Sequence, residues 1–124
     1  MKKDKIIFWI TTGIVSVMML YSAFSYLTNE QIKLAFVHLG FPSYFRIELA
    51  IAKALGSIVL LLPIFPNRLK EFAYFGFTIT FISAFIAHIS SGDPISVATA
   101  PLVFLVILLI SYIYFHKTRQ LEIK

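Results

Sequence analysis

Four segments of this chain are each long and apolar enough to cross a lipid bilayer, and they constrain the fold more than any other feature. The first runs from Ile6 to Leu27 without a charged residue. At about 1.5 Å per residue, roughly 20 apolar residues span the hydrocarbon core. Of the 124 residues, 59% are hydrophobic and only 14% are charged, which excludes an average soluble domain. The sequence therefore predicts transmembrane helices over about residues 6–27, 45–62, 72–89 and 98–115.

These segments predict an all-α fold, with residues 1–124 forming one integral membrane domain, a four-transmembrane-helix bundle. Strands are excluded because the runs lack polar alternation and backbone groups in lipid must pair internally. A short interfacial helix is expected between helices one and two, where the run Thr28-Asn29-Glu30-Gln31 offers an N-cap and Gly40 a stop. Its apolar positions recur at helical spacing at Ile32, Ala35, Phe36 and Leu39. We expect this amphipathic segment to lie in the membrane interface.

The first and last apolar segments each need a further interpretation. The basic start, the apolar run and the small residues around Ala23 also fit a secretory signal peptide. Signal peptides have apolar regions of about 7–15 residues, and this longer run favours a transmembrane helix. The last helix is expected to start at about Ser96 or Thr99, because Pro101 is tolerated in or near a first turn.

The basic residues predict the orientation in the membrane. In a four-span arrangement, one side holds Lys2, Lys3, Lys5, Arg68, Lys70, Lys117, Arg119 and Lys124. The other side holds Lys33 and Arg46. By the positive-inside rule, both termini are predicted to be cytoplasmic, in the plasma (inner) membrane. The net charge of +5 does not indicate a nucleic-acid partner, because the basic residues sit at the ends of apolar runs instead of clustering on one exposed face.

Glu48 and Lys53 lie inside the second apolar segment and are the strongest functional lead. A charge at bilayer depth costs at least about 2.5 kcal/mol, so such residues usually face the bundle interior and find partners there. The five-residue offset places these two about 140° apart around a helix, so they are not expected to pair with each other. Lys53 therefore needs polar groups from another helix, or water. The candidates are Tyr21, Ser22, Ser25, Thr80, Ser83, His88 and Asp93.

These residues predict a polar pocket that opens outward. Its expected ligand-binding residues are Glu48, Lys53, His88, Tyr21, Ser25 and Ser83. Lys53 is the positive centre for an amphiphilic or anionic small molecule, while Glu48 and His88 balance charge or accept protons. The alternative for the two charges is a structural role, since buried charges also fix the register between helices.

Two further basic residues need an interpretation. His88 is either a hydrogen-bonded residue at a helix end or a proton-handling group, because histidine titrates near physiological pH. Arg46 is expected to extend its charged end to the outer interface.

The residue content also excludes several chemistries. The chain has no cysteine, which rules out disulfides, thiolate nucleophiles and Cys-ligated clusters. There is no Gly-rich phosphate loop, HExxH helix or Ser-His-Asp arrangement, so no catalytic residue is predicted. The residues that gather outside the membrane are His38, His88, Glu30 and Asp93, without the spacing of a metal site. No metal and no cofactor are therefore expected.

Short motifs follow one another along nearly the whole chain. They are His38-Leu39-Gly40-Phe41-Pro42-Ser43-Tyr44-Phe45-Arg46, Ala52-Lys53-Ala54-Leu55-Gly56, Leu61-Leu62-Pro63, Arg68-Leu69-Lys70-Glu71-Phe72-Ala73-Tyr74-Phe75-Gly76-Phe77, Ser83-Ala84, His88, Gly92-Asp93-Pro94 and Ser111-Tyr112. In this order they resemble the DoxX-like family of small four-helix membrane proteins. The resemblance implies the fold and the membrane location. The family name comes from a subunit associated with thiosulfate:quinone oxidoreductase, and relatives are linked to redox complexes or, in animals, to receptor assembly.

Two classes of function follow. The first is an accessory or ligand-binding membrane subunit, whose partners are the lipid bilayer, another membrane protein or a second copy of the chain, and a small amphiphilic ligand. The alternative is a subunit of a quinone-linked membrane oxidoreductase, for which quinone is the cofactor. The sequence leaves open whether the protein is an enzyme.

Overall fold

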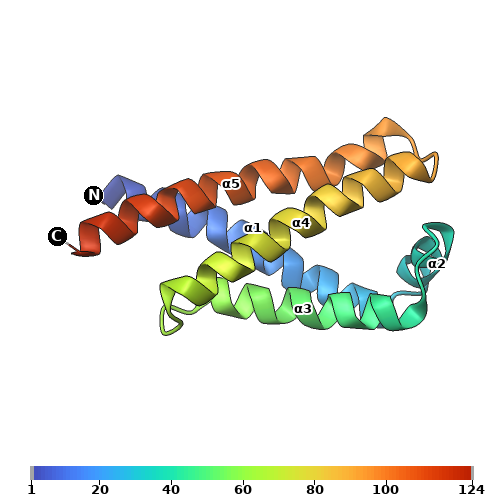
Figure 1. Ribbon diagram of the computed structural model, residues 1–124, viewed down its shortest axis with the longest axis horizontal. Helices are drawn as coiled ribbons and strands as arrows, with labels where there is room; N and C mark the ends of the chain where they lie inside the picture. Colours follow the sequence, from blue (N-terminus) through green and yellow to red (C-terminus); the bar gives the residue numbers. More distant parts are fainter. Residues whose placement is uncertain (1, 124) are drawn as a thin grey trace.

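The computed structural model describes residues 2–123, and the side chains of residues 2–118. It consists of five helices, which are α1 (Lys2–Thr28), α2 (Glu30–His38), α3 (Ser43–Leu61), α4 (Asn67–Ser90) and α5 (Ile95–Ile123). The all-α prediction is therefore confirmed for the described part of the chain (Figure 1). The short second helix also falls where the sequence places it.

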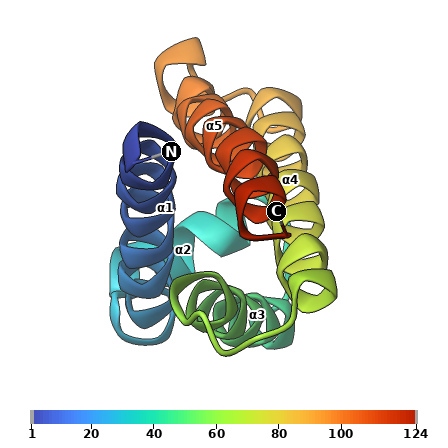
Figure 2. The ribbon, with the colours of Figure 1, turned by 90° about the vertical axis from the view of Figure 1, so that its left-hand side faces the viewer.

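The four long helices form a ring in which α1 packs against α3 and α5, and α4 packs against the same two helices. Figure 2 shows this ring from one end, with α2 behind it. The two termini lie at the same end of the bundle as the α3–α4 turn, and α2 lies at the opposite end with the α4–α5 turn (Figure 1). The basic residues of this group that the structure describes, which are Lys2, Lys3, Lys5, Arg68, Lys70 and Lys117, thus lie toward one end of the molecule. We call the opposite end the α2 end.

Three of the helices are long and apolar enough to cross a membrane, and these are α1, α4 and residues Ile95–Thr118 of α5. The sequence predicts four such spans. Among the four long helices, α3 is the one that does not qualify, because it carries three charged residues, Arg46, Glu48 and Lys53. A further difference concerns α5, which begins at Ile95 and thus carries Pro101 in its interior.

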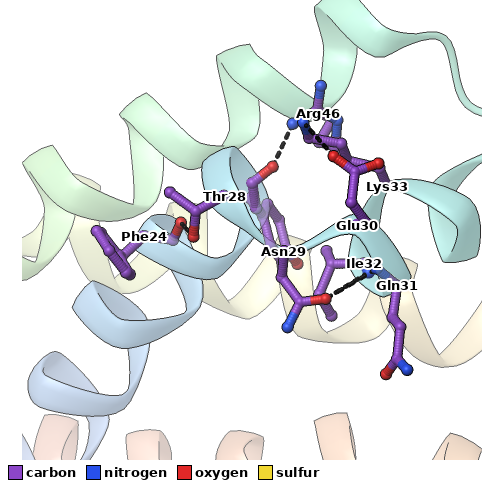
Figure 3. Close-up of polar contacts among 9 residues, drawn as sticks. Phe24, Thr28, Asn29, Glu30, Gln31, Ile32, Lys33 and Arg46 are labelled. Carbon is purple, nitrogen blue, oxygen red and sulfur yellow. Dashed lines mark hydrogen bonds and ion pairs between the residues drawn. The ribbon is translucent and has the colours of Figure 1, made fainter.

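Local hydrogen bonds explain where α2 begins and where α2 and α4 end. The side-chain oxygen of Asn29 accepts from the amides of Gln31 and Ile32 at 2.8 and 3.3 Å, which caps the start of α2 (Figure 3). Gly40 and Gly92 have φ angles of 86° and 80°, a conformation that favours glycine. The amide after each glycine returns to a carbonyl of the last helical turn, from Phe41 to Phe36 and from Asp93 to His88. These are Schellman motifs.

The half of the bundle near the termini is closed by a polar cluster within the apolar core. The Ser111 hydroxyl lies 2.6 Å from the Thr12 hydroxyl and 2.7 Å from the Tyr74 hydroxyl, and this joins α5 to α1 and α4. All three side chains are buried. Phe8 and Phe115 pack in the same core. Buried hydroxyls that bond to one another satisfy most of their hydrogen-bonding capacity, so this cluster is a structural element.

Lys70 is a buried cation with a structural role. Its ammonium group donates to the carbonyls of Val59, Leu60 and Leu62 at 2.8, 3.2 and 2.9 Å. The last carbonyls of a helix have no intrahelical partner, and a lysine can satisfy them. Lys70 from α4 therefore caps the C-terminus of α3.

Candidate functional site

The bundle contains a cavity of about 580 Å³ in its α2-end half, and all five helices contribute to its wall. Most of its lining is apolar. The lining residues are Met19, Ser22, Tyr26, Ile32, Ala35, Phe36, Leu39, Phe41, Phe45, Leu49, Lys53, Ile79, Thr80, Phe81, Ser83, Ala84, Ala87, His88, Val97, Ala100, Pro101 and Phe104. A largely apolar pocket with a few convergent polar groups is the usual form of a small-molecule site.

Lys53 reaches the cavity from the middle of α3. The buried residues of α3 are Arg46, Ala50, Lys53, Ser57 and Leu60, which recur every three or four residues and thus lie on one face. Its ammonium group donates to the Ser22 hydroxyl at 3.0 Å and to the Tyr26 hydroxyl at 2.6 Å, both on α1. It also lies 4.1 Å from the centre of the Tyr26 ring, which is a cation–π contact.

Lys53 and its two partners have hydrogen-bond donors that are not used within the described structure. An ammonium group has three N–H donors, and the described residues accept two of them. The hydroxyls of Ser22 and Tyr26 accept from Lys53, so their own hydrogens remain available to other groups. None of the residues that line the cavity is an Asp or Glu. The site therefore has a positive charge and up to three free hydrogen-bond donors, and its wall contains no carboxylate.

Arg46 contacts the main chain of the same tyrosine. Its guanidinium donates to the main-chain carbonyl of Tyr26, and only 9% of its surface is exposed. The expectation that Arg46 extends to the outer interface is therefore wrong. The physical reason is that Tyr26 lies in the last turn of α1, where carbonyls lack intrahelical partners. Two cations of α3 thus fix the position of one residue of α1.

Two histidines share one carboxylate at the α2 end of the bundle. His38, the last residue of α2, lies 2.8 Å from Asp93 through Nε2, and His88 near the end of α4 lies 2.7 Å from it through Nδ1. These hydrogen bonds hold the pKa of Asp93 below its ordinary value, and the bond with His88 has a larger effect than the bond with His38. The bridge joins α2 to the α4–α5 turn. Residues 2–118 contain no group of three or more metal-ligating side chains arranged to hold a metal ion.

The apolar face of α2 covers the cavity. Ile32, Ala35, Phe36 and Leu39 all line it. The sequence places this face in the membrane interface, but the structure turns it toward the bundle. The cavity offers the same apolar surroundings as the interface, so the amphipathic pattern alone does not separate the two positions.

The model of the DoxX-like family matches residues 10–111, which include every residue of the cavity wall. The chain belongs to the DoxX-like family. No curated protein and no solved structure matches it. Membership of the DoxX-like family confirms the resemblance seen in the sequence and, with the apolar helices, supports a small membrane protein.

The structure of this DoxX-like protein brings together three of the six predicted site residues. Lys53, Ser83 and His88 line the cavity. Glu48 lies on the exposed side of α3, and Tyr21 on α1 is 66% exposed. Ser25 is half-buried and is not part of the cavity wall. The polar groups of the cavity thus differ in part from those that the sequence predicts.

Tyr26 was not among the partners that the sequence analysis expected for Lys53, so this contact was missed. A signal for this contact is present in the chain. Buried residues of α1 recur at Thr12, Val15, Met19 and Ala23, and Ser22 and Tyr26 continue the same helical face. Ser22 was among the expected partners of Lys53, and this expectation is confirmed.

Proposed function

We propose that this DoxX-like chain is a multi-pass plasma-membrane protein that binds an anionic amphiphile in its cavity, as an accessory or ligand-binding subunit. The headgroup lies at Lys53 and the apolar body lies along the cavity. Both termini are cytoplasmic and the α2 end faces outward. The proposal rests on one observation, namely a buried ammonium group with a spare donor in an apolar cavity that has no carboxylate in its wall.

In this proposal α3 is the fourth helix that crosses the membrane. Its 19 residues correspond to about 28 Å at 1.5 Å per residue, close to the hydrocarbon thickness of about 30 Å. Two of its three charges, Arg46 and Lys53, are buried in the bundle and hydrogen-bonded to α1. The third, Glu48, lies near the outer end. Charges turned inward do not meet lipid, so the composition of α3 is compatible with a span.

The ligand class follows from the charge and shape of the cavity. A buried cation without a counterion is costly, and an anionic ligand removes that cost. A carboxylate has two acceptor oxygens, which match the donors of Lys53, Ser22 and Tyr26. The apolar wall formed by α2, α4 and α5 suits an alkyl chain.

The test is equilibrium binding of radiolabelled dodecanoate to the protein in lipid nanodiscs, with empty nanodiscs subtracted. Dodecanol is the neutral comparison. Loss of a charged hydrogen bond costs about 1.5–3 kcal/mol, so Lys53→Met is expected to weaken dodecanoate binding by roughly 10- to 150-fold. Glu48→Gln, on the exposed side of the same helix, is the matched control and is expected to bind normally. Equal binding of dodecanoate by the wild type and by Lys53→Met contradicts the proposal.

A quinone-linked oxidoreductase subunit is the second candidate. The observation that favours it is that the same donors at Lys53, Ser22 and Tyr26 suit a quinone carbonyl oxygen, with the ring and tail in the apolar part of the cavity. Quinone in extracts of the purified protein, together with quinone reduction by an added donor such as thiosulfate, supports this function. Protein that carries no quinone and does not reduce it supports the binding role.

A further inference from the structure

A groove between α3 and α4 meets the main cavity at Lys53. The groove has a volume of about 180 Å³ and is lined by residues of these two helices alone. Leu49, Lys53 and Thr80 line both the groove and the main cavity. A path therefore leads from the side of the bundle to the ammonium group.

The groove opens on the outer surface of the helix ring. Phe72 on its rim is 66% exposed, and Ala52 and Gly76 are also exposed. Of the neighbouring pairs in the ring, α3 and α4 pack against each other least extensively. The wall includes Ala52 and Gly56 on α3, and Ala73 and Gly76 on α4. Small side chains on both helices leave this space between them.

We propose that the ligand reaches Lys53 from the lipid bilayer through the α3–α4 groove; this inference rests on the proposed function. The ligand is a lipid-soluble anion that is already dissolved in the membrane. Its headgroup moves along the groove to the ammonium group of Lys53, and its apolar body then occupies the main cavity.

The two ends of the cavity are covered. At the α2 end, the apolar face of α2 covers the cavity, and the His38–Asp93–His88 bridge joins α2 to the α4–α5 turn. Toward the termini, the core around Tyr74 and Ser111 fills the bundle. In the groove itself, a methyl group on Gly56 would lie 3.0 Å from the Phe77 ring, so the groove wall between these two residues is tightly packed. Between these two ends, the groove reaches Lys53 from the side of the bundle.

Gly76 allows the groove to be filled without disturbing the core. A Cβ added at Gly76 meets no other atom within 4 Å, and the same holds for Gly13 on α1, which lines neither the groove nor the cavity. Gly76→Leu thus places a large side chain in the groove. Gly13→Leu is the matched control, since it makes the same change in helix propensity at an open site.

The experiment measures the association and dissociation rates of a fluorescent dodecanoate analogue with the wild type and both variants in nanodiscs, alongside Lys53→Met. We expect Gly76→Leu to slow both rates by about tenfold, as a barrier raised by about 1.4 kcal/mol would do, with an unchanged dissociation constant. Gly13→Leu is expected to match the wild type.

The outcomes separate the two proposals. If Gly76→Leu and Gly13→Leu have equal rates while Lys53→Met loses binding, the side route is wrong and the binding site stands. The side route is also wrong if Gly76→Leu weakens equilibrium binding with a normal association rate, because the groove is then part of the site. If the wild type shows no binding that depends on Lys53, the proposed function and the side route both fail.

Discussion

The hydrogen bond between Lys53 and Tyr26 offers a quantitative test of the candidate site. Tyr26→Phe removes the hydroxyl that lies 2.6 Å from the ammonium group and keeps the ring that lies 4.1 Å from it. Lys53 is only 6% exposed, and the described residues then offer it Ser22 alone. A hydrogen bond to a charged group contributes about 1.5–3 kcal/mol, so we expect Tyr26→Phe to lower the free energy of unfolding by that amount.

The double variant Lys53→Met with Tyr26→Phe separates this bond from other effects. Because the charge and its acceptor leave together, no buried charge lacks a partner, and the two changes are expected to be non-additive by about 1.5–3 kcal/mol. The free energy of unfolding is measured for the four proteins of the cycle by denaturant titration in mixed micelles. Tyr21→Phe is the control, because that side chain is 66% exposed, and it is expected to change stability by less than about 0.5 kcal/mol.

A coupling energy below about 0.5 kcal/mol would refute this reasoning. Water in the cavity would then replace the Tyr26 hydroxyl at no cost, and Lys53 would not depend on α1. Ser22 and Tyr26 would then not be needed to hold the ammonium group in position for a ligand.

Three further changes test other parts of the structure. Lys70→Met leaves three carbonyls at the end of α3 without their donor and is expected to cost about 3 kcal/mol in the same titration, whereas no change contradicts the capping role. Asp93 has a lower pKa in the folded protein than in the unfolded chain, so its bridge stabilises the fold fully above about pH 4 and less as the pH falls. Asp93→Asn should flatten the fall in melting temperature below about pH 4, and an unchanged pH profile rules out this contribution. The buried Ser16 hydroxyl has no hydrogen-bond partner among the described residues, so Ser16→Ala should be neutral or stabilising by up to about 1 kcal/mol, while Ser111→Ala, which loses two partners, should cost about 1–3 kcal/mol.

The helices and their ends were largely predictable, because these features depend on local chemistry. Asn29 and Gly40 act on backbone groups within a few residues, and both have the predicted roles. Pro101 shows where such reasoning stops. A helix already established by Ile95 continues through this proline, although proline favours a first turn. Helical periodicity predicts where the helices lie in the sequence, but it does not by itself show that four of them cross the membrane.

The candidate site was predictable only in part, because burial depends on which face of a helix meets its neighbours. The 140° offset between Glu48 and Lys53 indicated that both cannot point the same way. It did not tell which of them faces inward. The stripe of buried residues from Arg46 through Ala50 to Lys53 settles this, and it leaves Glu48 outside. The contact with Tyr26 depends on the register between α1 and α3, which no local pattern specifies.

Charge balance is what distinguishes the two buried polar clusters of this bundle. Thr12, Tyr74 and Ser111 are neutral hydroxyls that bond to one another, and such a cluster needs nothing further from outside. Ser22, Tyr26 and Lys53 are also held between helices, but they carry a full positive charge into a cavity whose wall has no carboxylate. A cluster whose only role is to fix helix register is most stable when its charge is neutralised within the protein. The unbalanced charge at Lys53, next to a space of about 580 Å³, therefore argues for a ligand more strongly than burial of a lysine alone.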